Sequence, residues 1–181
     1  TVQAIDGTSQ VVTITINGTN DAPVNTVAGP ISVVEDIATA ITGISVTDSD
    51  STTGTTTVTL SVPVGTFNAT SGAGVTVSGS GGDTLILTGT QSAINSFIAA
   101  SGLTYTSAAN ANGTVVMTMT TNDGASGGGL TTSSNITLNI TPVNDAPVNT
   151  VTAGQATNED SSKALTGLEI ADAGNGKSGG R

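Results

Sequence analysis

Cysteine, histidine and tryptophan are absent from this chain of 181 residues, and its only aromatic side chains are Phe67, Phe97 and Tyr105. Without cysteine, neither disulfides nor thiolate metal sites hold the chain together. Without cysteine and histidine, serine and cysteine triads and the usual zinc sites are also excluded. The sequence therefore predicts a protein that is not an enzyme.

Basic side chains are nearly as scarce. Thirteen carboxylates stand against three Lys and Arg residues, the formal net charge is −10, and the first basic residue is Lys163. An acidic cluster before that position has no salt-bridge partner in its repeat and needs solvent, protons or a bound cation. We expect no nucleic-acid partner, because phosphate binding needs Lys and Arg. We also expect no membrane span, because no apolar run is long enough.

An internal repeat organises the sequence. The octapeptide Asn-Asp-Ala-Pro-Val-Asn-Thr-Val occupies residues 20–27 and returns at residues 144–151, 124 positions later. Further matches at the same offset are Glu35-Asp36 with Glu159-Asp160, 41–44 with 165–168, and Asp48 with Asp172. Eight consecutive identities followed by matches without gaps indicate tandem repeats.

The repeat predicts three segments. Residues 1–20 form the C-terminal strands of a preceding repeat, residues 21–144 form a complete module, and residues 145–181 begin a following repeat with a flexible end from 174. In the first segment, residues 11–16 match the predicted strand at 135–140. The chain begins with Thr1 rather than methionine, which predicts a piece of a longer protein.

Strand patterns fill the module. Segments rich in β-branched residues alternate with period two and are bounded by turn residues; they are 41–47, 56–62, 74–78, 84–87, 114–120 and 136–140. Residues 31–34 follow Pro30 and predict an edge strand. About seven short strands in one repeat predict an all-β, Greek-key sandwich of immunoglobulin-like type.

Residues 90–100 break this pattern. Their apolar residues have helical spacing, which predicts one short helix with Thr90 or Ser92 as its N-cap. We assign Phe97 and Tyr105 to the core.

Eleven of the thirteen carboxylates lie in junction motifs. The first junction has Asp6, Asp21, Glu35, Asp36, Asp48 and Asp50, and the second has Asp123, Asp145, Glu159, Asp160 and Asp172. A sandwich gathers its loops at two ends, so we expect each set to meet at one place. Oxygen ligands of this kind favour a hard cation, and a flexible set favours calcium over magnesium.

Turn formation is the alternative explanation for these acids. Asp and Asn commonly shape turns, which accounts for any one of them. It does not account for five or six acids converging without Lys or Arg nearby. The second junction has one acid fewer, because Gly174 stands at the position that corresponds to Asp50.

Four motifs together resemble a known family. They are the Asn-Asp-Ala-Pro-Val linker, the Val-x-Glu-Asp start at 33–36, the Val-Thr-Asp-x-Asp loop at 46–50 and the segment at 87–114. They look like the cadherin-like repeats of very large bacterial surface adhesins. This resemblance implies rigid, calcium-stiffened, extracellular spacers between a cell-surface anchor and a binding head.

The resemblance also implies a set of calcium ligands. They are Asn20, Asp21, Glu35, Asp48 and Asp50 at the first junction, and Asp123, Asn144, Asp145, Glu159 and Asp172 at the second. Asp6 completes the predicted set from the residues alone, through its Asp-Gly loop.

The expected function is a calcium-rigidified structural and adhesive spacer whose partners are the neighbouring repeats of the same chain. One alternative is an extracellular filament subunit, because the orphan strands at 1–20 and 145–181 could be completed by other copies through β-strand exchange. A second is a calcium-dependent carbohydrate-binding module, although the chain lacks the Trp or Tyr platform expected for sugars.

Overall fold

The computed structural model describes residues 2–16, 18–50, 54–125 and 129–172, and in these ranges the chain consists mostly of strands and loops, with one short helix. The predicted all-β sandwich is therefore confirmed. The predicted flexible end at 174–181 lies outside the described residues. No helix in the described part of the chain is long and apolar enough to cross a membrane.

One face of the sandwich is a six-stranded sheet. Its strands, in spatial order, are β4 (Ile31–Val34), β13 (Thr131–Thr141), β12 (Gly113–Asn122), β7 (Thr56–Ser61), β10 (Thr84–Gly89) and β9 (Val75–Ser78). Alternate residues of β7 and β12 are buried, as expected where one face of a sheet packs on a core.

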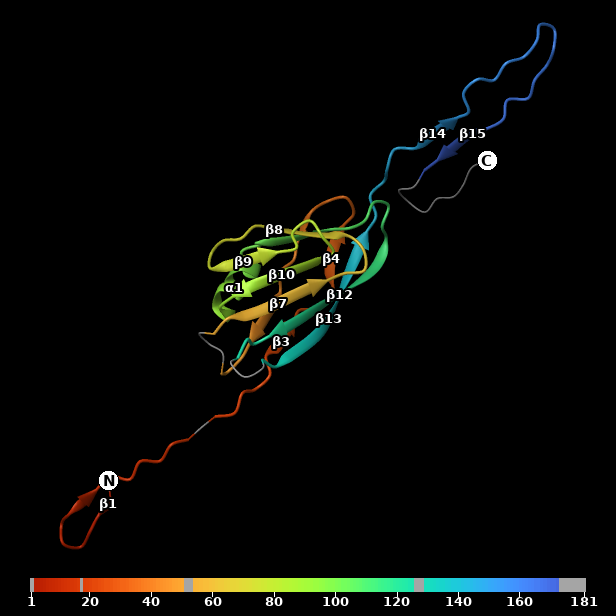
Figure 1. Cartoon of the computed structure of the whole chain (residues 1–181). Coiled ribbons are helices and arrows are strands. Elements are labelled where there is room, and N and C mark those ends of the chain that lie inside the picture. Colours follow the sequence, from red (N-terminus) through yellow and green to blue (C-terminus); the bar gives the residue numbers. More distant parts are fainter. Residues whose placement is uncertain (1, 17, 51–53, 126–128, 173–181) are drawn as a thin grey trace.

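The opposite layer consists of two smaller sheets. One has the order β5 (Thr39–Ala40), β11 (Leu103–Thr106) and β8 (Thr66–Ala69), and the other pairs β3 (Val24–Val27) with β6 (Ile44–Thr47). Two further hairpins, β1 (Val2–Gln3) with β2 (Ser9–Gln10) and β14 (Val148–Val151) with β15 (Leu168–Ala171), project from opposite ends of the sandwich (Figure 1).

The first strands of the module change sheets. The chain enters as β3 beside β6 and then crosses to the six-stranded sheet as β4, which pairs in parallel with β13. β4 is an edge strand, as predicted. The side chain of Asn25, on β3, donates to the backbone carbonyls of Met119 and Thr132 and accepts from the Thr121 hydroxyl. These bonds tie the entry strand to β12 and β13.

The buried residues of the hydrophobic core all come from the part of the sequence that runs from Val33 to Ile140. Phe67 and Tyr105 meet in it with ring centroids 5.6 Å apart. The Tyr105 hydroxyl donates to the Val64 carbonyl, which satisfies the polar end of a fully buried ring. Burial also raises the pKa of Tyr105. The core positions predicted for Phe97 and Tyr105 are confirmed.

The predicted helix is α1 (Gln91–Ala99), and Thr90 rather than Ser92 is its N-cap. The Thr90 hydroxyl accepts from the backbone N–H of Ala93 at 3.2 Å. The side chain of Asn95 accepts from the N–H of Val46 and donates to the carbonyl of the same residue. The helix therefore closes the edge of β6 that β3 leaves open.

Loops close two other strand edges. At β9, the Ser71 hydroxyl accepts from the N–H of Val77, and Gly72 exchanges two backbone hydrogen bonds with Val75. At β8, the Ser80 hydroxyl accepts from the N–H of Ala69. Backbone donors that a foreign strand would use are thus already bound within the module.

Three details of the strand prediction were wrong. The segment at 41–47 was predicted as one strand, but only 44–47 form a strand, β6, because Gly43, at φ +76°, turns the chain before it. The module strands β3, β5, β8 and β11 were not predicted. The predicted strand at 11–16 is extended coil without a pairing partner in the described structure.

Candidate metal centre at the end of the module

The topology brings two distant segments together. Because β4 and β13 are parallel and Val34 lies opposite Thr141, the residues after both strands emerge at the same end of the sheet. The N–H of Glu35 donates to the carbonyl of Thr141 at 3.0 Å, which extends the ladder by one bond. The Glu35-Asp36 turn therefore lies beside the linker that leaves the module.

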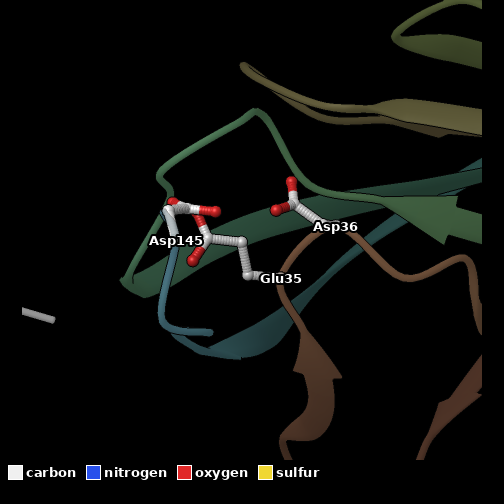
Figure 2. A group of neighbouring side chains, drawn as sticks. All are labelled: Glu35, Asp36 and Asp145. Atoms are coloured by element: carbon white, nitrogen blue, oxygen red, sulfur yellow. The ribbon is translucent and has the colours of Figure 1, made fainter. Parts of the chain in front are cut away.

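Three carboxylates meet at this end. Ligand oxygens of Glu35, Asp36 and Asp145 lie within 4.8 Å of one another (Figure 2). Glu35 is 1% exposed, and its Oε2 accepts from the N–H of Val143 at 3.0 Å. Within the described part of the chain, its Oε1 is buried without a hydrogen-bond partner, as is Oδ2 of Asp145.

The electrostatics of this cluster oppose ionisation of Asp145. Burial, followed by the charges of Asp36, Glu35 and Asp172, raises the pKa of Asp145. The one basic side chain among the described residues is Lys163, whose Nζ donates to the carbonyl of Ala156. The cluster thus combines negative charge, oxygen donors and an unsatisfied buried oxygen. That chemistry fits a hard divalent cation.

This arrangement corrects one part of the sequence analysis. Glu35 and Asp36 were assigned to the first junction with Asp21, but the structure places them at the end of the module, beside Asp145 of the second. The reason is that β3 and β4 carry the chain along the sandwich before residue 35. The two ends are separated by about the length of β13, roughly 35 Å.

The opposite end of the module holds Asn20, Asp21, Asp48, Asp50 and Asp123. The assignment of Asp123 to the second junction was therefore wrong, because the hydrogen bond from Asn20 places it with the residues of the first. Asp123 is fully buried, and its Oδ1 accepts from the N–H groups of Ala125 and Leu130 at 3.1 and 3.0 Å. Its Oδ2 accepts from the Asn20 amide at 2.6 Å. These donors lower the pKa of Asp123, with the Ala125 N–H first and the Asn20 amide second.

Two further acids at that end, Asp48 and Asp50, also bind backbone donors. Oδ2 of Asp50 accepts from the N–H of Asp21 at 2.6 Å, and Oδ1 of Asp48 accepts from the N–H of Asp50 at 2.9 Å. A hollow of about 460 Å³ lies beside Asp21 and Asp48. Turn formation therefore accounts for much of what these side chains do here.

The remaining predicted ligands, Asp6, Asn144, Glu159 and Asp172, are all exposed. Asp6 is exposed in the turn between β1 and β2, where it accepts from the N–H and hydroxyl of Thr8, and these bonds lower its pKa. Asn144 and Glu159 are exposed, and Asn144 donates to the carbonyl of Asp145. Asp172 is exposed and acts electrostatically on Asp145. Asp36 was not in the predicted ligand set. Its signal in the sequence was the Glu-Asp pair, which occurs at residues 35–36 and again at 159–160.

Comparisons with protein families, curated proteins and solved structures find no match for this chain. The assignment of a function therefore rests on the geometry of the site.

Proposed function

We propose that this chain is a calcium-rigidified structural and adhesive spacer of a secreted, cell-surface repeat protein, with its neighbouring repeats as partners and no catalytic role. The observation that carries this proposal is the buried carboxylate of Glu35, which lies in a cluster with Asp36 and Asp145 and whose Oε1 has no hydrogen-bond donor among the described residues. A buried carboxylate without a compensating partner is costly. A bound cation would remove that cost.

The mechanism is mechanical. Glu35 and Asp36 belong to the module, whereas Asp145 lies in the linker beyond β13. A calcium ion held by all three would fix the direction in which the linker leaves the module. Asp172 belongs to the following repeat and acts electrostatically on Asp145. The positive charge of the same ion would therefore also attract the next module. Without calcium these carboxylates repel one another, and the linker is free to bend.

The N-terminal flank supports the tandem arrangement. Val12, Ile14 and Ile16 are the repeat counterparts of Ile136, Leu138 and Ile140 on β13. The three residues on β13 are 2%, 0% and 5% exposed, whereas those on the flank are 60%, 79% and 89% exposed. The flank thus carries a core-forming face in the register of a last strand, as expected for the end of another module.

The described edges of the module do not favour the filament alternative, because loops and the helix already bind backbone donors at β6, β8 and β9. No feature of the described surface favours the carbohydrate alternative.

Calorimetric melting of the whole chain, first in EDTA and then in millimolar calcium, tests the proposal. A site filled at one hundred times its dissociation constant contributes about 2.7 kcal/mol. We expect the melting temperature to rise by roughly 5–10 °C. Magnesium should give a much smaller rise, because it demands a stricter octahedral geometry.

Two variants locate the site. Glu35→Gln keeps an acceptor for the N–H of Val143 but removes the charge, so the calcium-dependent rise should be lost. Asp83→Asn is the matched control, because Asp83 is exposed and lies outside both acidic groups; its rise should match that of the wild type. An unchanged rise in Glu35→Gln contradicts the assignment of the site. No rise in the wild type contradicts calcium binding.

A further inference from the structure

The direction of load through the module follows from its topology. The two flanking hairpins leave the sandwich at opposite ends (Figure 1). β4 is reached from the N-terminal flank, and β13 leads directly into the C-terminal linker. Because these two strands are parallel neighbours, tension between the flanks pulls them in opposite directions along their common axis.

Such loading places the β4–β13 ladder in shear. The bonds of a parallel ladder are evenly spaced along the strands, so sliding one strand past the other stretches all of them together. The paired register runs from Ile31 opposite Leu138 to Val34 opposite Thr141. Val33 is fully buried in the core, which opposes sliding of β4 by a second means.

Glu35 continues this ladder beyond the last strand residue. Its N–H donates to the carbonyl of Thr141, and its Oε2 accepts from the N–H of Val143. These bonds join the chain after β4 to the last residue of β13 and to the linker that follows it. The carboxylates of Asp36 and Asp145 also face each other across these two chains (Figure 2).

We propose that β4 and β13 form a shear clamp that bears tension through the module, and that Glu35, Asp36 and Asp145 close its end. A cation bound by these three residues links the two strands of the clamp along the direction of load. Its effect is therefore to raise the force at which the module opens, in addition to fixing the linker. The cation part rests on the proposed function, whereas the clamp itself does not.

The entry strand strengthens the same load path. Before tension reaches β4, it must detach β3 from β6. The Asn25 side chain resists this step, because it is bonded to the carbonyls of Met119 and Thr132. β3 is thus held to the sheet that contains the clamp.

Single-molecule pulling tests the clamp, and the absence of cysteine makes the attachment points unique. In the shear geometry, Thr19→Cys and Ala153→Cys place handles on exposed residues beyond opposite ends of the sandwich. In the peeling geometry, Thr19→Cys is combined with Thr131→Cys at the start of β13, so both handles lie at one end. We expect the rupture force in shear to be more than twice that in peeling.

The length released in the shear geometry identifies the event. Separation of β4 from β13 frees the chain between Ile31 and Thr141, about 110 residues, or roughly 360–400 Å of extended chain less the length of the folded module. Equal forces in the two geometries overturn the clamp. A released length far below this value does so as well.

Calcium provides the second comparison. In the shear geometry, calcium should raise the rupture force of the otherwise unaltered chain and of Asp83→Asn, but not that of Glu35→Gln. A calcium-dependent rise in melting temperature without a rise in rupture force overturns closure of the clamp and leaves the proposed function standing. Suppose instead that the rupture force in shear is more than twice that in peeling, but calcium does not change the melting temperature. That result overturns the proposed function and leaves the clamp standing.

Discussion

The two ends of the module use carboxylates in different ways. At the end where β13 begins, Asp123 binds two backbone N–H groups and one amide, and Asp50 binds another N–H. At the end where β13 finishes, Glu35 has a single N–H donor and retains one unsatisfied buried oxygen. The number of acids is therefore a poor guide to a metal site. The supply of N–H donors around them decides it.

Breaking the satisfied end should have the largest effect. Asp123→Ala leaves the N–H groups of Ala125 and Leu130 and the Asn20 amide without their acceptor. We expect the melting temperature to fall by roughly 10 °C, with or without calcium. Circular dichroism melts would measure it, with the exposed Asp83→Ala as control. A loss as small as that of the control would show that Asp123 does not stabilise this end.

A change between the two ends tests whether they act independently. Asn95→Ala removes both hydrogen bonds that α1 makes to Val46. We expect a loss of about 1–3 kcal/mol in urea unfolding, and the gain from calcium should stay unchanged. An altered calcium gain would mean that the metal centre depends on packing elsewhere in the module.

Removal of a carboxylate charge at the end that holds Glu35 should raise the free energy of unfolding rather than lower it. In EDTA, Glu35→Gln should stabilise the chain by about 1 kcal/mol, because it removes a buried charge and keeps an acceptor for Val143. Urea unfolding in EDTA checks this, and Asp123→Asn should destabilise the chain under the same conditions. A destabilised Glu35→Gln would show that its charge already has a partner without calcium.

The pH dependence gives the smallest and sharpest contrast. The pKa of Asp145 is raised from 3.8 in the folded chain. Its protonated form therefore adds to the free energy of unfolding below pH 3.8, and this stabilisation is lost as pH rises through the folded pKa.

The pKa of Asp123 is lowered from 3.8 in the folded chain. Its ionised form therefore adds to the free energy of unfolding above pH 3.8, and this stabilisation is lost as pH falls through the folded pKa. The free energy of unfolding, measured in EDTA between pH 7 and pH 2, should show both of these losses.

Single substitutions separate the two slopes. Asp145→Asn should flatten the curve above pH 3.8, and Asp123→Asn should flatten it below. If both substitutions altered the same part of the curve, the contrast between the two ends would be wrong.

Local sequence signals predicted much of this structure. Alternation predicted the strands of the six-stranded sheet, and the apolar spacing after Thr90 predicted the helix with its cap. The grouping of acids was less accessible, because it depends on the parallel pairing of residues that lie over a hundred positions apart. The bond between Asp123 and Asn20 was inaccessible for the same reason, because the two residues lie 103 positions apart in the sequence. The bonds of Asp123 to the N–H groups of Ala125 and Leu130 are local to its own loop.

The closed edges of the sheets have a consequence for folding in a repeat protein. Neighbouring copies in one chain stay at millimolar effective concentration throughout synthesis and folding. Nearly identical strands would then compete for one another, and exchange between neighbours is a common failure of such chains. Ser71, Ser80 and Asn95 occupy backbone groups that a neighbour's strand would need. In the proposed tandem arrangement, each copy can thus complete its own sandwich while its neighbours fold beside it.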